Sequence, residues 1–459
     1  MKKLWIVLLS VALIAAFAMP VCAADVKFSG SYVIQGYYEN NRALVDNGAS
    51  LMNTWQRLRM QTDIKVQEGL SLTVGADVMD KIWGASRSGT ATPGNYANVY
   101  NLPNNAEDEN IHFTMAYVSA NLWGGLLRVG YQRQGQFGTT FGDYGDYTYG
   151  PRIRYDYVIG PWTLLALYDK TEATQYYSST GPAGNIGVSS YQVDNQQDAY
   201  VLAFMYDWGK GNAGLLYKHL VDARNDGVVA PGATDTGYRR LWEIFDPYVK
   251  AQIGPVYLEA EGFYLTGKTK KYDVSGNGTD MTKDGLSAYI SATVDFAPAY
   301  AGITLVYVEG NDPTYTTSDK DNSGWPGMTD FNPCLILWNF DLQRWNGGIG
   351  PVTGAVNNMN GGISNAQFAQ IFAGVKPIPK LDVKASYSTA TADKDGVVGQ
   401  ISKNYGSEFD VMATYKIFDN LTYMVGFGYL WAGDYWKGSV ASNNIDNDYL
   451  VTQKLTLTF

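Results

Sequence analysis

Apolar and polar residues alternate with a period of two along most of the chain beyond residue 24. This period is typical of β-strands whose two faces meet different environments. In 286–296, for example, the even positions are all apolar, and all the odd positions except Tyr289 carry small polar or acidic residues. Residues 57–66 and 70–78 repeat the pattern, whereas the chain offers no amphipathic helical pattern of comparable length. The fold class is therefore expected to be all-β.

The alternation predicts about eighteen strands, and their connections indicate how the strands are arranged. The strands fall near 26–39, 52–66, 70–83, 111–122, 125–133, 152–159, 161–170, 198–208, 212–220, 243–253, 255–266, 285–297, 300–309, 366–376, 380–390, 405–418, 420–432 and 447–459. Short connections alternate with long ones, as in a closed meander with short periplasmic turns and long extracellular loops. We therefore predict a transmembrane antiparallel up-and-down β-barrel, with 16 strands as the alternative count.

The N-terminus has the residue pattern of an export signal. Lys2 and Lys3 precede an apolar run over 4–19, and Ala23 and Ala24 supply a small-residue cleavage site, so 1–24 is predicted to be a cleaved signal peptide. Cys22 leaves a lipoprotein as an alternative. Residues 25–459 are predicted to form a single barrel. Its long loops are expected near 84–110, 134–151, 171–197, 221–242 and 310–365.

Composition narrows the function classes. Aromatic residues make up 14% of the chain and charged residues only 17%, which argues against disorder. Only two cysteines are present, too few for a disulfide framework. The whole chain has a net charge of -10, and removal of two leader lysines makes it -12, a poor balance for a nucleic-acid partner.

The last strand carries the most specific motif. In "NDYLVTQKLTLTF" (447–459) an aromatic residue ends an alternating strand, whose outward positions are expected to include Tyr449, Leu455, Leu457 and Phe459. Here the chain resembles Gram-negative outer-membrane β-barrel proteins. The preceding "GSEFDVMATYKIFDNLTYMVGFGYLWAGDYW" is similar to the penultimate hairpin of large porins and alginate-export barrels. The resemblance implies an integral protein of the cell outer membrane, with lipid and the barrel assembly machinery as partners.

A barrel of this size encloses more space than side chains fill and leaves an aqueous channel unless a loop plugs it. We therefore expect a porin-like channel for passive or facilitated diffusion of small hydrophilic solutes, without a cofactor. An enzyme is not expected, because His112 and His219 have no recognisable nucleophile partner. The alternatives are a sheath around a multihaem electron-transfer partner and an exporter of an acidic polysaccharide. The sequence allows a monomer or a homo-oligomer.

Charged residues on the predicted inward faces suggest a selectivity device. Basic residues occupy early strands and acidic residues occupy later ones, so opposite walls of the lumen could carry opposite charge and orient charged solutes. The alternative is a set of scattered, solvated charges. The basic candidates are Arg57, Arg59, Arg128, Arg152 and Arg154, and the acidic ones are Glu259, Glu261, Glu408 and Asp410.

Two predicted loops could narrow the pore. The segment 135–150 carries Asp143 and Asp146, and inward folding would bring these carboxylates to Arg152 and Arg154. The apolar segment 331–340 is costly to expose, so burial in the barrel mouth or against other loops is expected, with Cys334 as a buried, unreactive residue.

A weak calcium-loop match precedes that apolar segment. It consists of Asp319, Asp321, Ser323, Gly324 and Asp330. Pro326 and the lack of flanking helices weaken the match, and no metal site is assigned.

Overall fold

The structure, a computed structural model, describes nine segments of the chain. They are residues 25–84, 111–143, 148–174, 195–223, 237–272, 278–313, 320–325, 330–339 and 363–459. The predicted signal peptide and large parts of the predicted long loops lie outside these residues.

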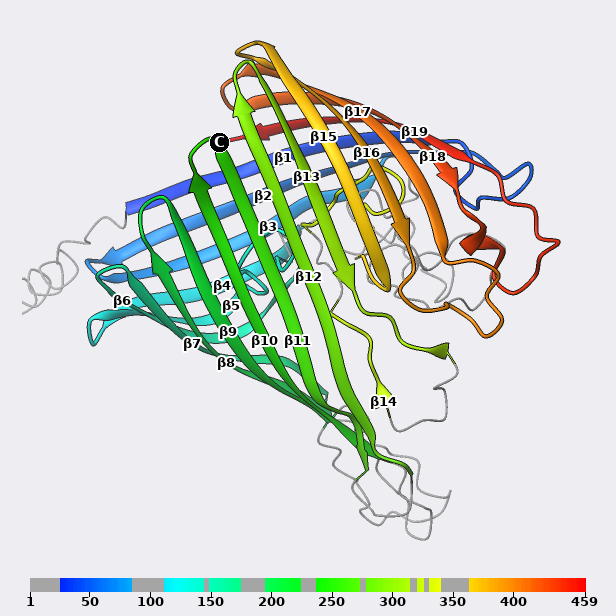
Figure 1. Ribbon diagram of the computed structural model, residues 1–459. Coiled ribbons are helices and arrows are strands. Elements are labelled where there is room, and N and C mark those ends of the chain that lie inside the picture. Colours follow the sequence, from blue (N-terminus) through cyan, green and yellow to red (C-terminus); the bar gives the residue numbers. More distant parts are fainter. Residues whose placement is uncertain are drawn as a thin grey trace, which may run out of the picture.

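Within the described residues, eighteen strands form one closed antiparallel barrel (Figure 1). β1 (Asp25–Glu39) pairs with β19 (Asp448–Thr458) and closes the ring. The strands between them are β2 (Leu51–Gln67), β3 (Leu70–Ile82), β4 (Ile111–Leu122), β5 (Gly125–Arg133), β6 (Tyr149–Ile159), β7 (Trp162–Thr174), β8 (Asn195–Asp207), β9 (Gly211–Asp222), β10 (Tyr238–Ile253), β11 (Val256–Tyr272), β12 (Met281–Phe296), β13 (Ala299–Val308), β15 (Ala366–Ile378), β16 (Leu381–Thr391), β17 (Asn404–Phe418) and β18 (Leu421–Ala432). The predicted all-β antiparallel barrel is confirmed, with 18 strands rather than 16.

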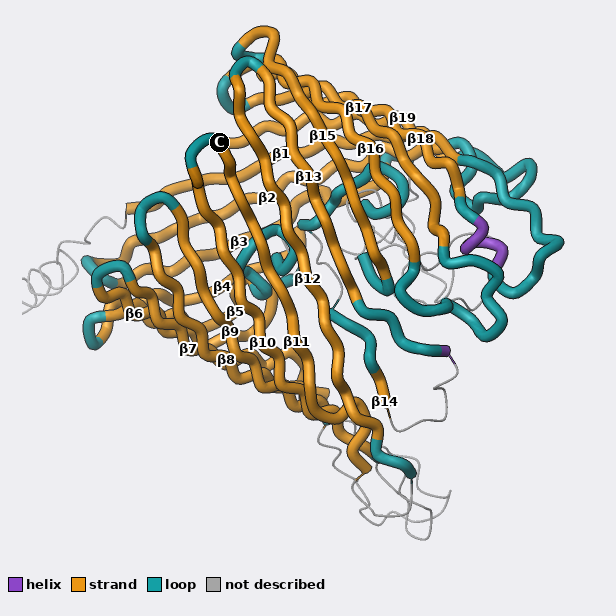
Figure 2. The backbone as a smooth tube through the Cα atoms, in the orientation of Figure 1, coloured by secondary structure: helices purple, strands orange, loops and turns teal. Residues whose placement is uncertain are grey.

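Two small elements lie outside the ring. β14 (Lys320–Asp321) pairs in parallel with the start of β12, while β13 pairs directly with β15. The 3-10 helix η2 (Asp434–Lys437) follows β18 at the long-loop end (Figure 2). No helix in the described part of the chain is long and apolar enough to cross a membrane.

The seam between the first and last strands runs from Ser31 opposite Thr458 to Glu39 opposite Leu450, and one further pair of hydrogen bonds closes it at the end with the short turns. The backbone N–H of Gly30 donates to the carbonyl of Phe459 at 2.9 Å, and the N–H of Phe459 donates back at 3.0 Å. A Cβ on Gly30 would lie 2.8 Å from the Phe459 ring, so the close approach requires glycine at this position. The odd-numbered residues of β19, including Tyr449, Leu455 and Leu457, face outward, as Val451 shows by its 47% exposure.

The outer face of the barrel is apolar. On β12, Leu286 and Ile290 are 44% and 42% exposed, whereas the intervening Ser287 and Tyr289 are buried inside the ring. Trp123, beside a short turn, is 83% exposed, as an aromatic residue at a membrane–water boundary would be. Hydrocarbon offers backbone groups no hydrogen-bond partners, and the closed ring satisfies them without an open edge.

The inside of the barrel is not uniformly polar. A large apolar cluster lies within the ring, where strand residues such as Phe263, Tyr289 and Phe368 pack against residues of two inward-folded loops. These loops run between the walls of strands (Figure 2). Inward apolar positions therefore mark the places where the lumen is filled by protein.

The strand ends near the long loops extend further than predicted. β10 begins at Tyr238, β11 continues to Tyr272 and β12 begins at Met281, each at least four residues beyond the alternating segment. Beyond the lipid, both faces of a strand meet water or protein, and the alternation that identifies a strand is lost.

Candidate functional site: the lumen and its two inward loops

The inward arginines are paired with aspartates on adjacent strands. Arg59 on β2 donates to both carboxylate oxygens of Asp77 on β3 at 2.6 and 2.7 Å. Arg152 on β6 holds Asp169 on β7 in the same two-pronged way, with distances of 2.6 and 2.7 Å. Such bidentate pairs fix both side chains against the wall.

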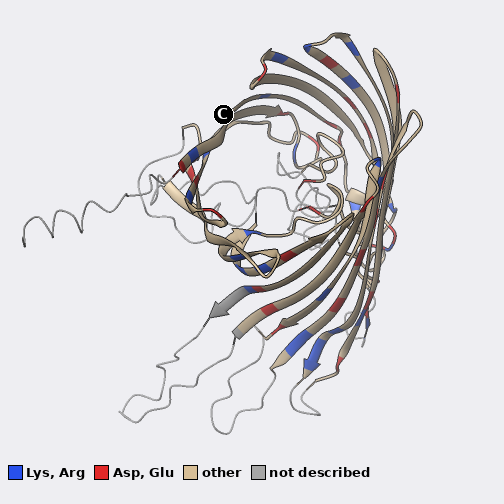
Figure 3. Cartoon of the chain, turned by 90° about the vertical axis from the view of Figure 1, so that its left-hand side faces the viewer, with Lys and Arg blue, Asp and Glu red and all other residues tan. Residues whose placement is uncertain are grey.

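The other candidate arginines also lie against neighbouring groups. Arg154 contacts Asp156 at 2.7 Å, and Arg128 reaches the same carboxylate at 3.6 Å. The Arg57 guanidinium lies 5.1 Å from the centre of the Trp55 ring. Basic and acidic residues are interspersed along the strands rather than separated onto opposite sides (Figure 3). Aspartates therefore lie beside four of the five basic candidates, Arg59, Arg128, Arg152 and Arg154, and reduce their net charge locally, while the arrangement of a basic and an acidic wall stays a prediction.

Two of the acidic selectivity candidates, Glu261 and Glu408, bind the backbone of the inward loops. Glu259 accepts hydrogen bonds from Tyr257 at 2.7 Å and Tyr289 at 3.3 Å. Glu261 and Glu408, by contrast, are buried and bind loop backbone.

Residues 134–143, the first inward loop, fold into the barrel and end on Glu261. One oxygen of this carboxylate accepts from the backbone N–H of Thr139 at 3.0 Å, from its hydroxyl at 2.5 Å and from the N–H of Gly142 at 3.1 Å. The first inward loop thus folds inward, but it is anchored by Glu261 and not by the predicted contacts with Arg152 and Arg154. Arg152 and Arg154 pair with wall aspartates, and Asp146 lies outside the described residues.

Residues 330–339, the second inward loop, are anchored by Glu408 on β17. The backbone N–H groups of Leu335, Ile336 and Leu337 donate to its two oxygens at 2.9, 2.7 and 2.6 Å. The side chains from Cys334 to Trp338 are all buried, so the predicted burial of this segment is confirmed for the residues described.

The two inward loops meet inside the ring. The Phe141 ring stacks on Tyr289 with centroids 5.5 Å apart and meets Phe331 edge-on at 5.3 Å. The N–H of Asp330 donates to the carbonyl of Asp143 at 3.1 Å. The loops therefore form one apolar body across part of the lumen, fixed to β11 by Glu261 and to β17 by Glu408.

Cys334 lies beside Glu408 and Asp410, and potential ligand atoms of the three residues lie within 4.8 Å of one another. Both Glu408 oxygens already accept hydrogen bonds from backbone N–H groups of the second inward loop, so this carboxylate anchors the loop and is not assigned to a metal ion. Burial, together with the nearby Glu408 and Asp410 carboxylates, raises the pKa of the Cys334 thiol. This agrees with the prediction of an unreactive cysteine.

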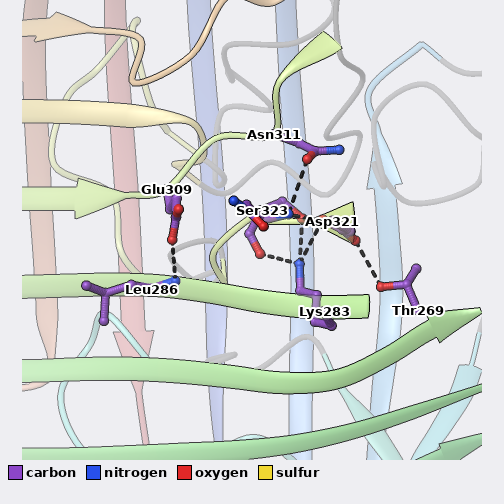
Figure 4. Close-up of polar contacts among 8 residues, drawn as sticks. Thr269, Lys283, Leu286, Glu309, Asn311, Asp321 and Ser323 are labelled. Carbon is purple, nitrogen blue, oxygen red and sulfur yellow. Dashed lines mark hydrogen bonds and ion pairs between the residues drawn. The ribbon is translucent and has the colours of Figure 1, made fainter. Parts of the chain in front are cut away.

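The weak calcium-loop match contains an internal cation instead. The Lys283 ammonium donates to the Asp321 carboxylate at 3.1 Å and to the Ser323 hydroxyl at 2.7 Å (Figure 4). Thr269 donates to the second Asp321 oxygen at 3.1 Å. Asp319 lies outside the described residues. Asp321 and Ser323 of the motif therefore hold a lysine and fix residues 320–325 to the barrel wall.

His219 lies on the outer side of the ring. Its Nδ1 is 2.7 Å from Glu243, which also accepts the Tyr217 hydroxyl at 2.5 Å. These residues alternate with the inward-facing Lys218 and Ile244, so the group is remote from the lumen. His112 lies on β4, opposite Asp77 in the pairing with β3.

Sequence reasoning missed several lumen residues. The paired Asp77, Asp156 and Asp169 occupy inward positions of the same alternating strands as the arginines or their neighbours, so the period of two could have found them. The loop donors could not be found in this way, because they are backbone N–H groups and every residue except proline has one.

Searches against protein-family models and against curated proteins found no match. Three solved Pseudomonas aeruginosa structures are similar over nearly the whole chain at 11% identity. OccK9 (OpdG) gives a TM-score of 0.51, covering 95% of this chain and 99% of that one. OccK1 (OpdK), an outer membrane protein, gives 0.50 with 94% and 98% coverage, and OccK3 (OpdO) gives 0.50 with 94% and 96%. The chain therefore shares the fold of these barrels.

Proposed function

We propose that the protein is an outer-membrane channel for passive or facilitated diffusion of small hydrophilic solutes. The observation that carries this proposal is a closed ring of 18 strands, apolar outside, with paired charges and two anchored loops inside. A ring of this size leaves space beyond what wall side chains fill. Loops fixed in part of that space narrow the passage and give it a defined cross-section.

Selectivity is assigned to the charged residues around this passage. The candidates among the described residues remain Arg57, Arg59, Arg128, Arg152, Arg154, Asp143 and Glu259, and Asp146, which lies outside them, stays a candidate from the sequence alone. An arginine paired with an aspartate carries no net charge and acts as a fixed dipole. The wall therefore has little net positive charge, and we expect the channel to have only a modest preference between anions and cations. Glu261, Glu408 and Asp410 act through loop position instead.

The two alternative functions would require the inward loops to move. A sheath around a multihaem protein, or a conduit for a polysaccharide, needs the space that Phe141 and Trp338 occupy with their neighbours. The small-solute channel needs no such displacement. The proposal includes recognition of the outward residues of β19 by the barrel assembly machinery and leaves a homo-oligomer open.

Recording from purified protein in planar bilayers under a salt gradient tests the proposal. Discrete conductance steps with a small reversal potential are expected. A folded barrel that inserts without passing current would contradict the channel function.

A further inference from the structure

Each of the two glutamates that anchor the inward loops has a buried aspartate beside it. Glu261 on β11 lies beside Asp246 on β10, and Glu408 lies beside Asp410, two residues further along β17. All four side chains are at most 4% exposed. In each pair the two side chains are in hydrogen-bond contact. Two acidic groups therefore meet inside the ring at each loop anchor.

In the first pair, the glutamate keeps one oxygen for the aspartate. Glu261 binds the first inward loop through Oε2 alone, and no other donor in the described part of the chain reaches its Oε1. The Oδ1 of Asp246 likewise has no other donor there. Two ionised carboxylates cannot hydrogen-bond each other, because neither carries a hydrogen. The contact therefore needs an acid proton, and we place it on Asp246, since Glu261 accepts three loop donors.

The second pair meets beside a glycine of the neighbouring strand. A Cβ on Gly428 of β18 would lie 2.7 Å from Asp410 Oδ1 and 3.4 Å from Glu408 Oε1, so the missing side chain leaves room for both oxygens. Asp410 Oδ1 has no other donor among the described residues, and Oδ2 accepts the Ser386 hydroxyl at 3.5 Å. Both Glu408 oxygens accept loop N–H groups. In this pair too, the proton belongs on the aspartate.

The charged and titratable groups near the pairs leave the aspartates without a cationic partner. Near the first pair they are Lys218 on β9, Tyr248 and Lys250 on β10, Glu259 on β11, Tyr289 on β12 and Asp143 of the loop, and near the second they are Lys384 on β16 and Cys334 of the loop. Within the described residues, Lys250 and Lys384 contact aromatic rings, and no ion pair joins them to Asp246 or Asp410. Loss of the shared proton would therefore leave two negative charges side by side, with no cation paired to them.

We propose that Asp246 and Asp410 are positioning residues, each of which locks one inward loop by sharing a proton with its glutamate. With the proton present, the pair bears one negative charge, and the glutamate holds the loop N–H groups. When the proton passes to water at higher pH, the two carboxylates repel each other and the glutamate releases the loop. This inference rests on the proposed channel function, because these loops are the ones that narrow the passage.

Hydrogen–deuterium exchange of the full-length barrel in detergent tests the locks between about pH 5 and pH 9. In Asp246→Asn and Asp410→Asn the amide donates to the glutamate at every pH, so the corresponding loop should stay protected. At the upper end of the range, the N–H groups of 139–142 and 335–337 should exchange at least about tenfold faster in the unchanged protein than in the matching variant, because a released loop loses charge-assisted hydrogen bonds. At the lower end this difference should disappear. Comparison at equal pH removes the chemical effect of pH on exchange.

Asp382→Asn is the matched control. Asp382 is an inward aspartate of β16 whose carboxylate accepts the Tyr300 hydroxyl at 3.0 Å, a contact within the barrel wall. This variant should keep the pH response of the unchanged protein. Loop amides that stay protected throughout the range, or an equal pH response with and without the two loop substitutions, would overturn the locks. The two pairs are tested separately, so a variant that does not fold leaves the other comparison intact.

Single-channel recording over the same pH range separates the locks from the channel. A conductance that rises with pH in the unchanged protein, and stays level in the double variant Asp246→Asn/Asp410→Asn, is expected. Loop exchange that depends on pH in a barrel that passes no current would support the locks and contradict the channel. A conductance that is independent of pH, with the loop amides protected throughout, would do the reverse.

Discussion

Two glutamates position the lumen loops, and each does so by accepting three hydrogen bonds. Glu261 binds Thr139 twice and Gly142 once, and Glu408 binds three consecutive N–H groups. A carboxylate facing several backbone donors holds a loop in one conformation, because each bond constrains a different peptide unit.

Glu408→Gln should loosen the second inward loop. The amide accepts through one oxygen only and brings two donors toward the loop N–H groups, so on the order of 1–3 kcal/mol of stability should be lost. A larger or noisier single-channel conductance is expected, together with a lower thermal midpoint. Glu259→Gln is the control, since its described partners are tyrosines. Equal effects of the two variants would contradict the anchoring role.

Arg59→Gln should destabilise the barrel more than the double variant Arg59→Gln/Asp77→Asn. The single change leaves a buried carboxylate without its bidentate partner, at a cost of about 3–5 kcal/mol. The double change also removes the unpaired Asp77 charge, so part of the lost free energy of unfolding is recovered. Urea unfolding in detergent of the unchanged protein, Arg59→Gln, Asp77→Asn and the double variant gives the coupling energy, and strict additivity would show that the pair is not coupled.

At this scale the sequence predicts which charged residues face inward but not what they bind. Arg59 and Glu408 both occupy alternating positions, yet Arg59 pairs with a neighbouring strand and Glu408 holds a loop 71 to 73 residues away in the sequence. Alternation fixes the face of a residue, whereas the partner depends on strand register and on loop path.

At the scale of elements, residues 320–325 act as a strap across the start of β12 and the end of β13. β14 pairs with β12, and the N–H of Gly324 donates to the carbonyl of Glu309 at 2.8 Å. Burial disfavours the ionised Asp321, but the Lys283 ammonium and the Ser323 donors outweigh it and lower the pKa of Asp321 below 3.8.

The stabilisation by Asp321 should depend on pH in a defined direction. Because the folded-state pKa is lowered, the contribution is full above about pH 3.8 and is lost as the pH falls through the lower folded value. Asp321→Asn should therefore reduce the thermal midpoint at pH 6, and the difference from the unchanged protein should shrink below pH 3.8. A difference that is constant with pH would contradict the ion pair.

The strands that cross the membrane are predictable, and the elements outside it are not. All eighteen predicted strands are present, because lipid on one face and the lumen on the other impose a period of two. β14 has only two residues and no periodicity to detect. The apolar inward faces of β7 to β9 are explained only by the loop that covers them.

At the scale of the whole molecule, the barrel wall separates two solvents, and the same substitution should have different costs on its two faces. Ile290 on β12 faces outward with 42% exposure, while Thr293 on the same strand faces the lumen. Ile290→Lys should cost about 2–4 kcal/mol if it lies near the bilayer midplane. Thr293→Lys should cost much less.

Refolding yield into lipid vesicles, followed by urea titration, compares these two variants. Equal losses would argue that the outer face does not contact hydrocarbon.

Cys334 gives the molecule an intrinsic chemical reporter. Apart from Cys22 in the predicted signal peptide, it is the only cysteine of the sequence, and it lies buried in the second inward loop. A maleimide added to the intact barrel should therefore leave it unmodified, and alkylation should begin only when that loop leaves its place. The rate of Cys334 alkylation thus reports how often the second inward loop leaves its position, without any engineered probe. Cysteines introduced elsewhere can be labelled without first removing Cys334.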